Sequence, residues 1–157
     1  MLFFLLRNHD KNTGFLNAIP AHWLVVFQSF RIFLELVVFA LFLEGITPKE
    51  ITFQGRSFEM LVGVAALPAG YFVWKGYYKI GITFNIFGLL SLVNIIFLAV
   101  FSFPTPFRLF NENFLPTYFP GILIPLFIAP MAIFMHVLSL IQLLKFKGKP
   151  ALLHQQK

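Results

Sequence analysis

Residues 19–43 read IPAHWLVVFQSFRIFLELVVFALFL, and this stretch decides the kind of protein that the sequence encodes. Only Arg31 and Glu35 in it carry a charge when histidine is neutral. A helix needs about 20 mostly apolar residues to cross the hydrocarbon core of a bilayer, and this stretch is long enough. Its apolar residues do not alternate strictly with polar ones, as they would in a strand of a membrane barrel. The stretch therefore predicts a membrane-spanning helix.

Three more apolar runs follow, at residues 58–74, 80–103 and 119–144. The run at 58–74 is the shortest and contains Pro68, whereas the run at 119–144 contains Pro125 and Pro130. Because each run approaches or exceeds the minimum of about 17 residues for a spanning helix, we predict four spans joined by short loops. We expect an all-α polytopic membrane protein, a four-helix transmembrane bundle, in which residues 1–157 form a single membrane domain ending in a cytoplasmic tail at 145–157.

The composition agrees with a membrane protein and excludes several kinds of site. Hydrophobic residues make up 59% of the chain and charged residues 11%, against about 25% charged residues in soluble domains. The chain has no cysteine, which excludes disulfides, thiolate metal sites, iron–sulfur clusters and cysteine nucleophiles. The net charge of +6 comes from basic residues at the ends of apolar runs, so we expect no nucleic-acid partner.

Lysine and arginine are distributed unequally between the two sides that four spans create. The side with both termini and the connection between the second and third spans carries eight of them: Arg7, Lys11, Lys75, Lys79, Lys145, Lys147, Lys149 and Lys157. The opposite side carries three, namely Lys49, Arg56 and Arg108. Short cytoplasmic loops are enriched in these residues. We therefore expect both termini to lie in the cytoplasm.

Small residues recur at helical spacing in the last three spans. In lipid, helices associate where small side chains let the backbones approach closely, so these stripes predict the faces that pack inside the bundle. They consist of Gly63, Ala66 and Gly70 in the second span, Gly81, Gly88 and Ser91 in the third, and Gly121, Pro125, Ala129, Ala132, His136 and Ser139 in the fourth.

The first span carries three polar residues on one face. Gln28, Arg31 and Glu35 fall within an arc of about 60° at about 100° per residue. Charged groups deep in a membrane are costly, face the protein interior and are usually paired. Arg31 and Glu35 lie one turn apart, and this spacing predicts an ion pair within the helix. Two interpretations are open: a neutralised pair that orients the helix, or a polar pocket or ion path.

Further polar residues of the other spans fall at similar depths. We predict a buried polar cluster that would form a binding site, with Tyr71 near its edge, made of Gln28, Arg31, Glu35, Asn85, Asn94 and His136. His136 alone is also explained as a core histidine bonded to a neighbour. Whether these side chains meet depends on the order and rotation of the helices.

No sequence motif points to a specific reaction. The chain lacks a glycine-rich phosphate loop and the motifs of zinc proteases and serine hydrolases. Haem between two helices needs two facing histidines. His22 and His136 differ by about 8 Å in depth at 1.5 Å per residue, so a haem protein is a weaker alternative. An intramembrane enzyme that uses Glu35 and His136 as base and acid is a weaker alternative. We expect no cofactor and no metal.

The hypothesis favoured by these residues is a non-enzymatic integral membrane protein whose buried polar cluster binds or passes a small solute or a proton. The alternative is an accessory or assembly subunit of a larger membrane complex, in which the polar residues contact a helix of another protein. The expected partners are the lipid bilayer and either another membrane protein or further copies of this chain.

Four further stretches resemble a group of uncharacterised bacterial multi-span membrane proteins, from about Ile19 onward. They are Ile19–Pro20 with Gln28–Arg31 and Glu35, then Ile51–Arg56, Asn85–Gly88 and Pro104–Arg108. The resemblance implies a location in the bacterial inner (plasma) membrane and no assigned activity. It also implies an apolar segment before the first span, so that Met1–Leu6 would be the remnant of a further helix.

Overall fold

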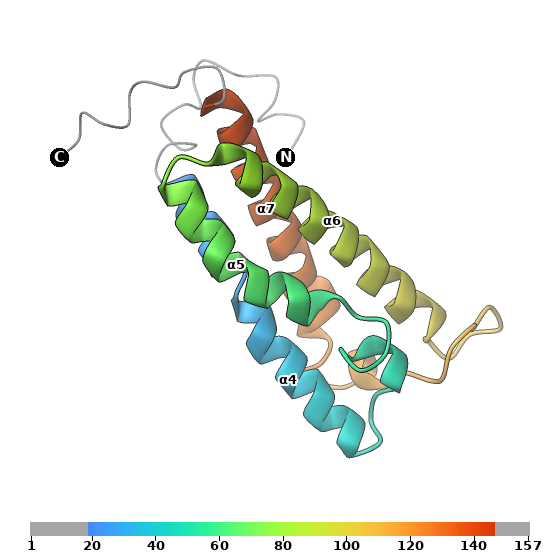
Figure 1. Cartoon of the computed structure of the whole chain (residues 1–157). Helices are drawn as coiled ribbons and strands as arrows, with labels where there is room; N and C mark the ends of the chain where they lie inside the picture. Colours follow the sequence, from blue (N-terminus) through green and yellow to red (C-terminus); the bar gives the residue numbers. More distant parts are fainter. Residues whose placement is uncertain (1–18, 147–157) are drawn as a thin grey trace.

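The computed structural model describes residues 19–146, and all regular secondary structure in that range is helical. Figure 1 shows long helices packed side by side, with irregular segments gathered at one end. The predictions for the N-terminal apolar run at 1–6 and for the tail beyond residue 146 concern residues outside the described range. The helices are α3 (Ala21–Phe27), α4 (Phe30–Leu43), η1 (Lys49–Ile51), α5 (Glu59–Trp74), α6 (Tyr78–Phe101), η2 (Leu115–Thr117), η3 (Ile124–Ile128) and α7 (Ala129–Phe146).

The first predicted span, 19–43, forms two consecutive helices rather than one. α3 ends at Phe27 and α4 begins at Phe30. At the junction the backbone forms bonds of the tighter 3₁₀ kind: the amides of Gln28, Ser29 and Arg31 donate to carbonyls three residues earlier. Proline, the commonest cause of such a break, is absent from the junction. The break lies directly before the charged residues of this span.

The other predicted spans agree with the structure to different degrees. α5 and α6 begin and end within two residues of the predicted runs. The fourth run was placed too early: residues 119–121 are irregular, and a five-residue π-helix, η3, precedes α7. Pro125 and Pro130 explain this irregular start, because each lacks the amide hydrogen that a regular helix needs.

Three helical segments among residues 19–146 are long and apolar enough to cross a membrane: Ala21–Leu43, Tyr78–Phe101 and Ile124–Lys145. The fourth helix, α5, is also apolar, but it has only 16 residues. The expectation of four full-length spanning helices is therefore reduced to three such helices and one shorter apolar helix.

The short helix α5 packs against the first half of the first span. A Cβ added at Gly70 would lie 2.2 Å from a methyl group of Val26, and one at Gly63 would lie 2.9 Å from the backbone nitrogen of Ile32. These contacts need glycine, as the small-residue stripe predicted. Because α5 ends beside His22 and begins near Arg31, it does not extend along the second half of α4.

Residues 44–58, which we call the return segment, lie where α5 is absent. This segment folds back along α4: Thr47 Oγ1 donates to the carbonyl oxygen of Val38 (3.3 Å), and the rings of Phe39 and Phe53 are 4.8 Å apart. Figure 1 shows it between the ends of α4 and α6. Ile51 and Thr52 are buried in it. A stretch expected to be an outer loop is thus partly an interior element.

The two ends of the bundle differ in composition. The end formed by the turn between α5 and α6 and by the last turn of α7 carries Lys75, Lys79 and Lys145, and we call it the lysine end. The opposite end carries the return segment and the proline-containing loop at 102–123, and we call it the proline end. The buried residues Gln28, Arg31, Glu35, Asn85 and His136 lie between these two ends.

Candidate functional site

Arg31 forms its ion pair with a different residue from the one expected. Its Nη1 lies 3.2 Å from Glu59 Oε2, and the Arg31 side chain is 2% exposed. Glu59 stands at the first position of α5, so the pair joins α4 to α5. The other carboxylate oxygen of Glu59 accepts a hydrogen bond of 2.7 Å from Ser91 Oγ of α6. Three helices therefore meet at this charge pair.

Glu35, the partner expected for Arg31, interacts with the return segment instead. It is 3% exposed, and its Oε2 accepts a hydrogen bond of 3.3 Å from Ser57 Oγ. The backbone of Phe53 provides a further favourable interaction with the same carboxyl group. Among the described residues no lysine, arginine or histidine forms a salt bridge with Glu35. Its Oε1 has no hydrogen-bond partner there either.

A second polar group lies closer to the lysine end. Asn85 of α6 shares a hydrogen bond of 2.8 Å with His136 Nδ1 of α7, and its amide nitrogen donates to Ser139 Oγ (3.0 Å) and to the carbonyl oxygen of Gly81 (2.8 Å). Asn85, His136 and Ser139 are fully buried. These bonds connect the faces of α6 and α7 that the small residues predicted.

Gln28 lies beside these groups, at the break in the first span. Its side chain is fully buried, and Nε2 donates a long hydrogen bond of 3.4 Å to the carbonyl oxygen of Ala132 in α7. His136 also lies close enough to Arg31 to interact with its charge. Gln28 and the two polar groups thus follow one another along the centre of the bundle.

Two other residues of the predicted cluster region have different partners. Asn94 donates from its amide nitrogen to the carbonyl oxygen of Arg56 (2.8 Å), so it holds the return segment rather than contacting Arg31. Tyr71, expected at the edge, is 52% exposed and stacks near Phe72 and Trp74 on the outer face of α5. Gln28, Arg31, Glu35, Asn85 and His136 are the members that the fold buries together along its axis.

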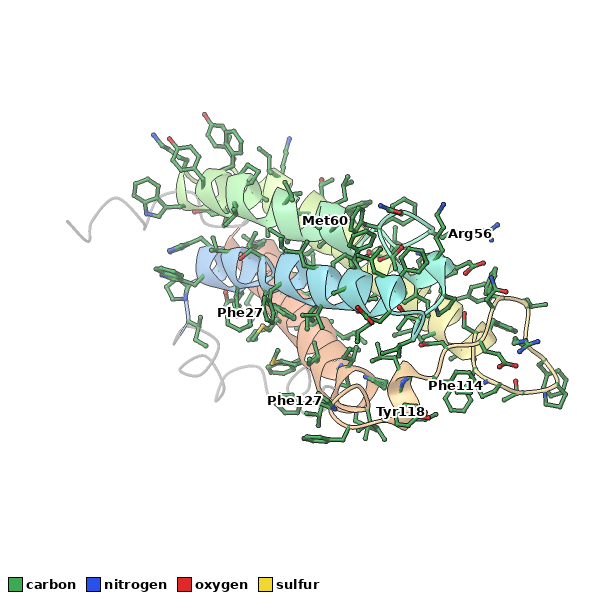
Figure 2. The ribbon with its side chains drawn as sticks, turned by 90° about the horizontal axis from the view of Figure 1, so that it is seen from below. Phe27, Arg56, Met60, Phe114, Tyr118 and Phe127 are labelled. Atoms are coloured by element: carbon green, nitrogen blue, oxygen red, sulfur yellow. The ribbon has the colours of Figure 1, made fainter. Side chains whose placement is uncertain are left out.

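A cavity of about 130 Å³ adjoins the ion pair on the side of the proline end. Arg31, Glu35 and Glu59 form its polar wall, Asn113 adds a neutral amide, and apolar residues of α4, η1, α6, the segment 115–128 and α7 form the rest. Figure 2 shows α4 diverging from η3 and α7 toward the end where Phe114 and Tyr118 lie. The residues that line it are Phe30, Arg31, Leu34, Glu35, Val38, Ile51, Glu59, Leu92, Ile95, Ile96, Ala99, Asn113, Leu115, Pro116, Gly121, Ile124, Pro125, Ile128, Ala129 and Ala132.

The polar wall of the cavity retains unused hydrogen-bonding capacity. Within residues 19–146, Arg31 Nε and Nη2 have no hydrogen-bond partner, and neither does Glu35 Oε1. Buried polar atoms of this kind cost free energy and are rare in folded proteins. Two residues that line one cavity therefore hold donors and an acceptor that a bound molecule with complementary groups would satisfy.

The sequence interpretation missed three residues of this site: Glu59, Ser57 and Ser91. Glu59 was not included in the predicted cluster, although it stands at the start of the run at 58–74. The short length of the run was the available signal, because a helix too short to cross the hydrocarbon core has at least one end inside it. A carboxylate at that depth needs a cationic partner, and Arg31 is the one at matching depth.

The described residues contain no group of three or more His, Cys, Asp or Glu side chains that would hold a metal ion. Comparison with curated proteins and with solved structures found no match. A family profile for a domain of unknown function, DUF8737, matches residues 3–144. The chain therefore belongs to the DUF8737 family.

Proposed function

We propose that this protein is a non-enzymatic membrane protein that binds a small molecule in the cavity beside the Arg31–Glu59 pair. The observation that carries the proposal is the unused hydrogen-bonding capacity of Arg31 and Glu35, two buried residues that line the same cavity. If the ion pair were purely structural, we would expect every N–H group of Arg31 to be paired, because a buried guanidinium with free N–H groups is costly. A bound molecule would satisfy these atoms.

In this proposal the chain lies in a bacterial inner membrane as a four-helix bundle with both termini in the cytoplasm. α5 is about 24 Å long at 1.5 Å per residue, less than the hydrocarbon core of about 30 Å. The return segment would complete that crossing, with its irregular backbone covered by α4 and α6. Non-helical backbone is tolerated at such depth where protein surrounds it. The excess of lysine at the lysine end supports the proposal that this end lies in the cytoplasm.

Native mass spectrometry of protein extracted in lipid nanodiscs tests the binding. We expect the wild-type chain to retain a small molecule, and Arg31→Leu and Glu35→Leu each to lose it while still inserting. Arg108→Leu is the matched control, since Arg108 is exposed and pairs with Glu112 outside the cavity. A molecule retained equally by all variants, or none in the wild type, would contradict the proposal. A stoichiometric protein partner in place of a small molecule would favour the accessory-subunit alternative.

The orientation has a separate test, which the absence of cysteine makes simple. Single cysteines are introduced as Lys49→Cys and Lys75→Cys, and intact cells are treated with a membrane-impermeant maleimide. We expect Lys49→Cys to be labelled from outside and Lys75→Cys only after the cells are opened. The reverse pattern would overturn the proposed orientation without affecting the binding proposal.

A further inference from the structure

The cavity continues into a groove that faces the surroundings of the bundle. The groove has a volume of about 740 Å³ and lies between α4 and the segment 114–128. It shares Leu34, Leu115 and Ile124 with the cavity. Its outer rim includes Phe33 and Phe119, whose side chains are 70% and 82% exposed. In a membrane these side chains would face lipid, and the groove borders the cavity that holds the polar wall.

The charges of the polar wall favour a neutral ligand. The wall holds one guanidinium and two carboxyl groups, from Arg31, Glu35 and Glu59. An anion would lie beside two carboxyl groups, and a cation would lie beside the guanidinium. A neutral group that both accepts and donates avoids either repulsion. The guanidinium of Arg31 would donate to its oxygen, and the carboxyl group of Glu35 would accept its hydrogen, as a hydroxyl group allows.

The dimensions of the two spaces suggest the shape of the ligand. A cavity of about 130 Å³ is close in size to an engineered apolar cavity of about 150 Å³ that binds benzene. The cavity therefore fits a head group of about one six-membered ring. The apolar groove is large enough to hold a hydrocarbon tail attached to that ring. Apart from the Tyr118 hydroxyl, the side chains that line the groove are apolar.

We propose that the ligand is a neutral amphiphile with a hydroxyl-bearing ring and one hydrocarbon tail, which enters the cavity sideways from the lipid bilayer. The ring lies against Arg31 and Glu35, and the tail lies in the groove beside Leu34. This inference rests on the proposed binding function, and it adds the chemical class of the ligand and its route of entry.

The test uses three probes with the full chain in nanodiscs: para-nonylphenol, its methyl ether para-nonylanisole, and phenol without a tail. We expect para-nonylphenol to bind one per chain and the ether to bind about tenfold more weakly, since one lost hydrogen bond is about a factor of ten. Phenol should bind more weakly than para-nonylphenol because it leaves the groove empty. This comparison needs only the wild-type chain, so it does not depend on the folding of any variant.

Two variants then test separately the contact with the head group and the position of the tail in the groove. Glu35→Leu should remove the preference for the phenol over the ether. Leu34→Trp, which fills the junction of cavity and groove, should weaken para-nonylphenol about tenfold and phenol much less. Leu36→Trp is the control, because Leu36 is half exposed and lines neither space.

Equal binding of phenol and ether by the wild type, or no effect of Leu34→Trp, would overturn the inference. If the wild type retains a native small molecule that Arg31→Leu loses and yet shows no preference among the probes, only this inference fails. If it retains none and also binds no probe, the proposed function fails as well.

Discussion

The pairing of Arg31 with Glu59 rather than Glu35 gives a quantitative prediction about stability. The perturbation is a pair of double-mutant cycles, one with Arg31→Leu and Glu59→Leu and one with Arg31→Leu and Glu35→Leu. We expect a strong coupling free energy in the first cycle and a weak one in the second. The reason is that Arg31 Nη1 and Glu59 Oε2 are 3.2 Å apart, whereas no salt bridge joins Arg31 to Glu35.

The magnitude follows from the geometry. At 3.2 Å two unit charges attract by about 5 kcal/mol at an effective dielectric constant of about 20. Removing one partner of a buried pair costs about 3–5 kcal/mol, because the other charge is left without compensation. Removing both relieves that penalty. We therefore expect a coupling of about 2–4 kcal/mol for Arg31 with Glu59, within the range of about 1.5–7 kcal/mol measured for close charge pairs.

The assay is reversible unfolding in bicelles, with the free energy of unfolding determined for the wild type, the three single variants and the two double variants. Coupling for the cycle with Glu35 should stay below about 1 kcal/mol, because the two side chains lie one turn apart without a salt bridge between them. A coupling with Glu35 equal to or larger than that with Glu59 would refute the assignment of the pair. It would favour the pair within one helix that the spacing of the sequence suggests.

Three more substitutions test the packing. Gly88→Val should lower the free energy of unfolding by about 1–3 kcal/mol, because a Cβ there would lie 2.2 Å from Cε1 of His136; unchanged stability would show that α6 and α7 are further apart. Asn94→Leu should speed amide hydrogen exchange in the return segment, because it removes the bond to the carbonyl of Arg56, and unaltered exchange would argue against that contact. Asn85→Leu should destabilise more than Asn94→Leu in the same unfolding assay, because it removes two bonds to α7.

The sequence was sufficient to predict the buried face of the first span. Gln28, Arg31 and Glu35 lie on one side of the helix by periodicity alone, and the structure buries all three. Helical periodicity is a local property, so it can be read from one segment. The partner of Arg31 depends on the depth at which the next helix begins and on its rotation. Those depend on tertiary packing, and the nearest carboxylate along the chain was not the nearest in space.

Asn94 is a second residue whose partner could not be predicted from the sequence. An asparagine in an apolar helix predicts a polar partner in the interior, and the partner is the backbone of Arg56 in the return segment. Residues 44–58 contain Glu44, Glu50 and Lys49 and therefore look like a surface loop. Nothing in their composition indicates that the chain turns back beside α4. The sequence therefore predicts that Asn94 has a polar partner, but it does not predict which residue provides that partner.

The short length of α5 has a consequence for how the chain is assembled. A segment of 16 residues with Pro68 inside and Glu59 at its start is a weak signal for insertion by the translocon, because it is shorter than the minimum of about 17 residues for a spanning helix. The preceding span carries Arg31 near its middle, where a charge costs about 2.5–3.5 kcal/mol on the insertion scale. Entering as a preformed hairpin would let these opposite charges neutralise each other before either reaches lipid. The ion pair would then matter most during biosynthesis, and ribosome-bound chains truncated within α5 should leave the first helix only partly inserted.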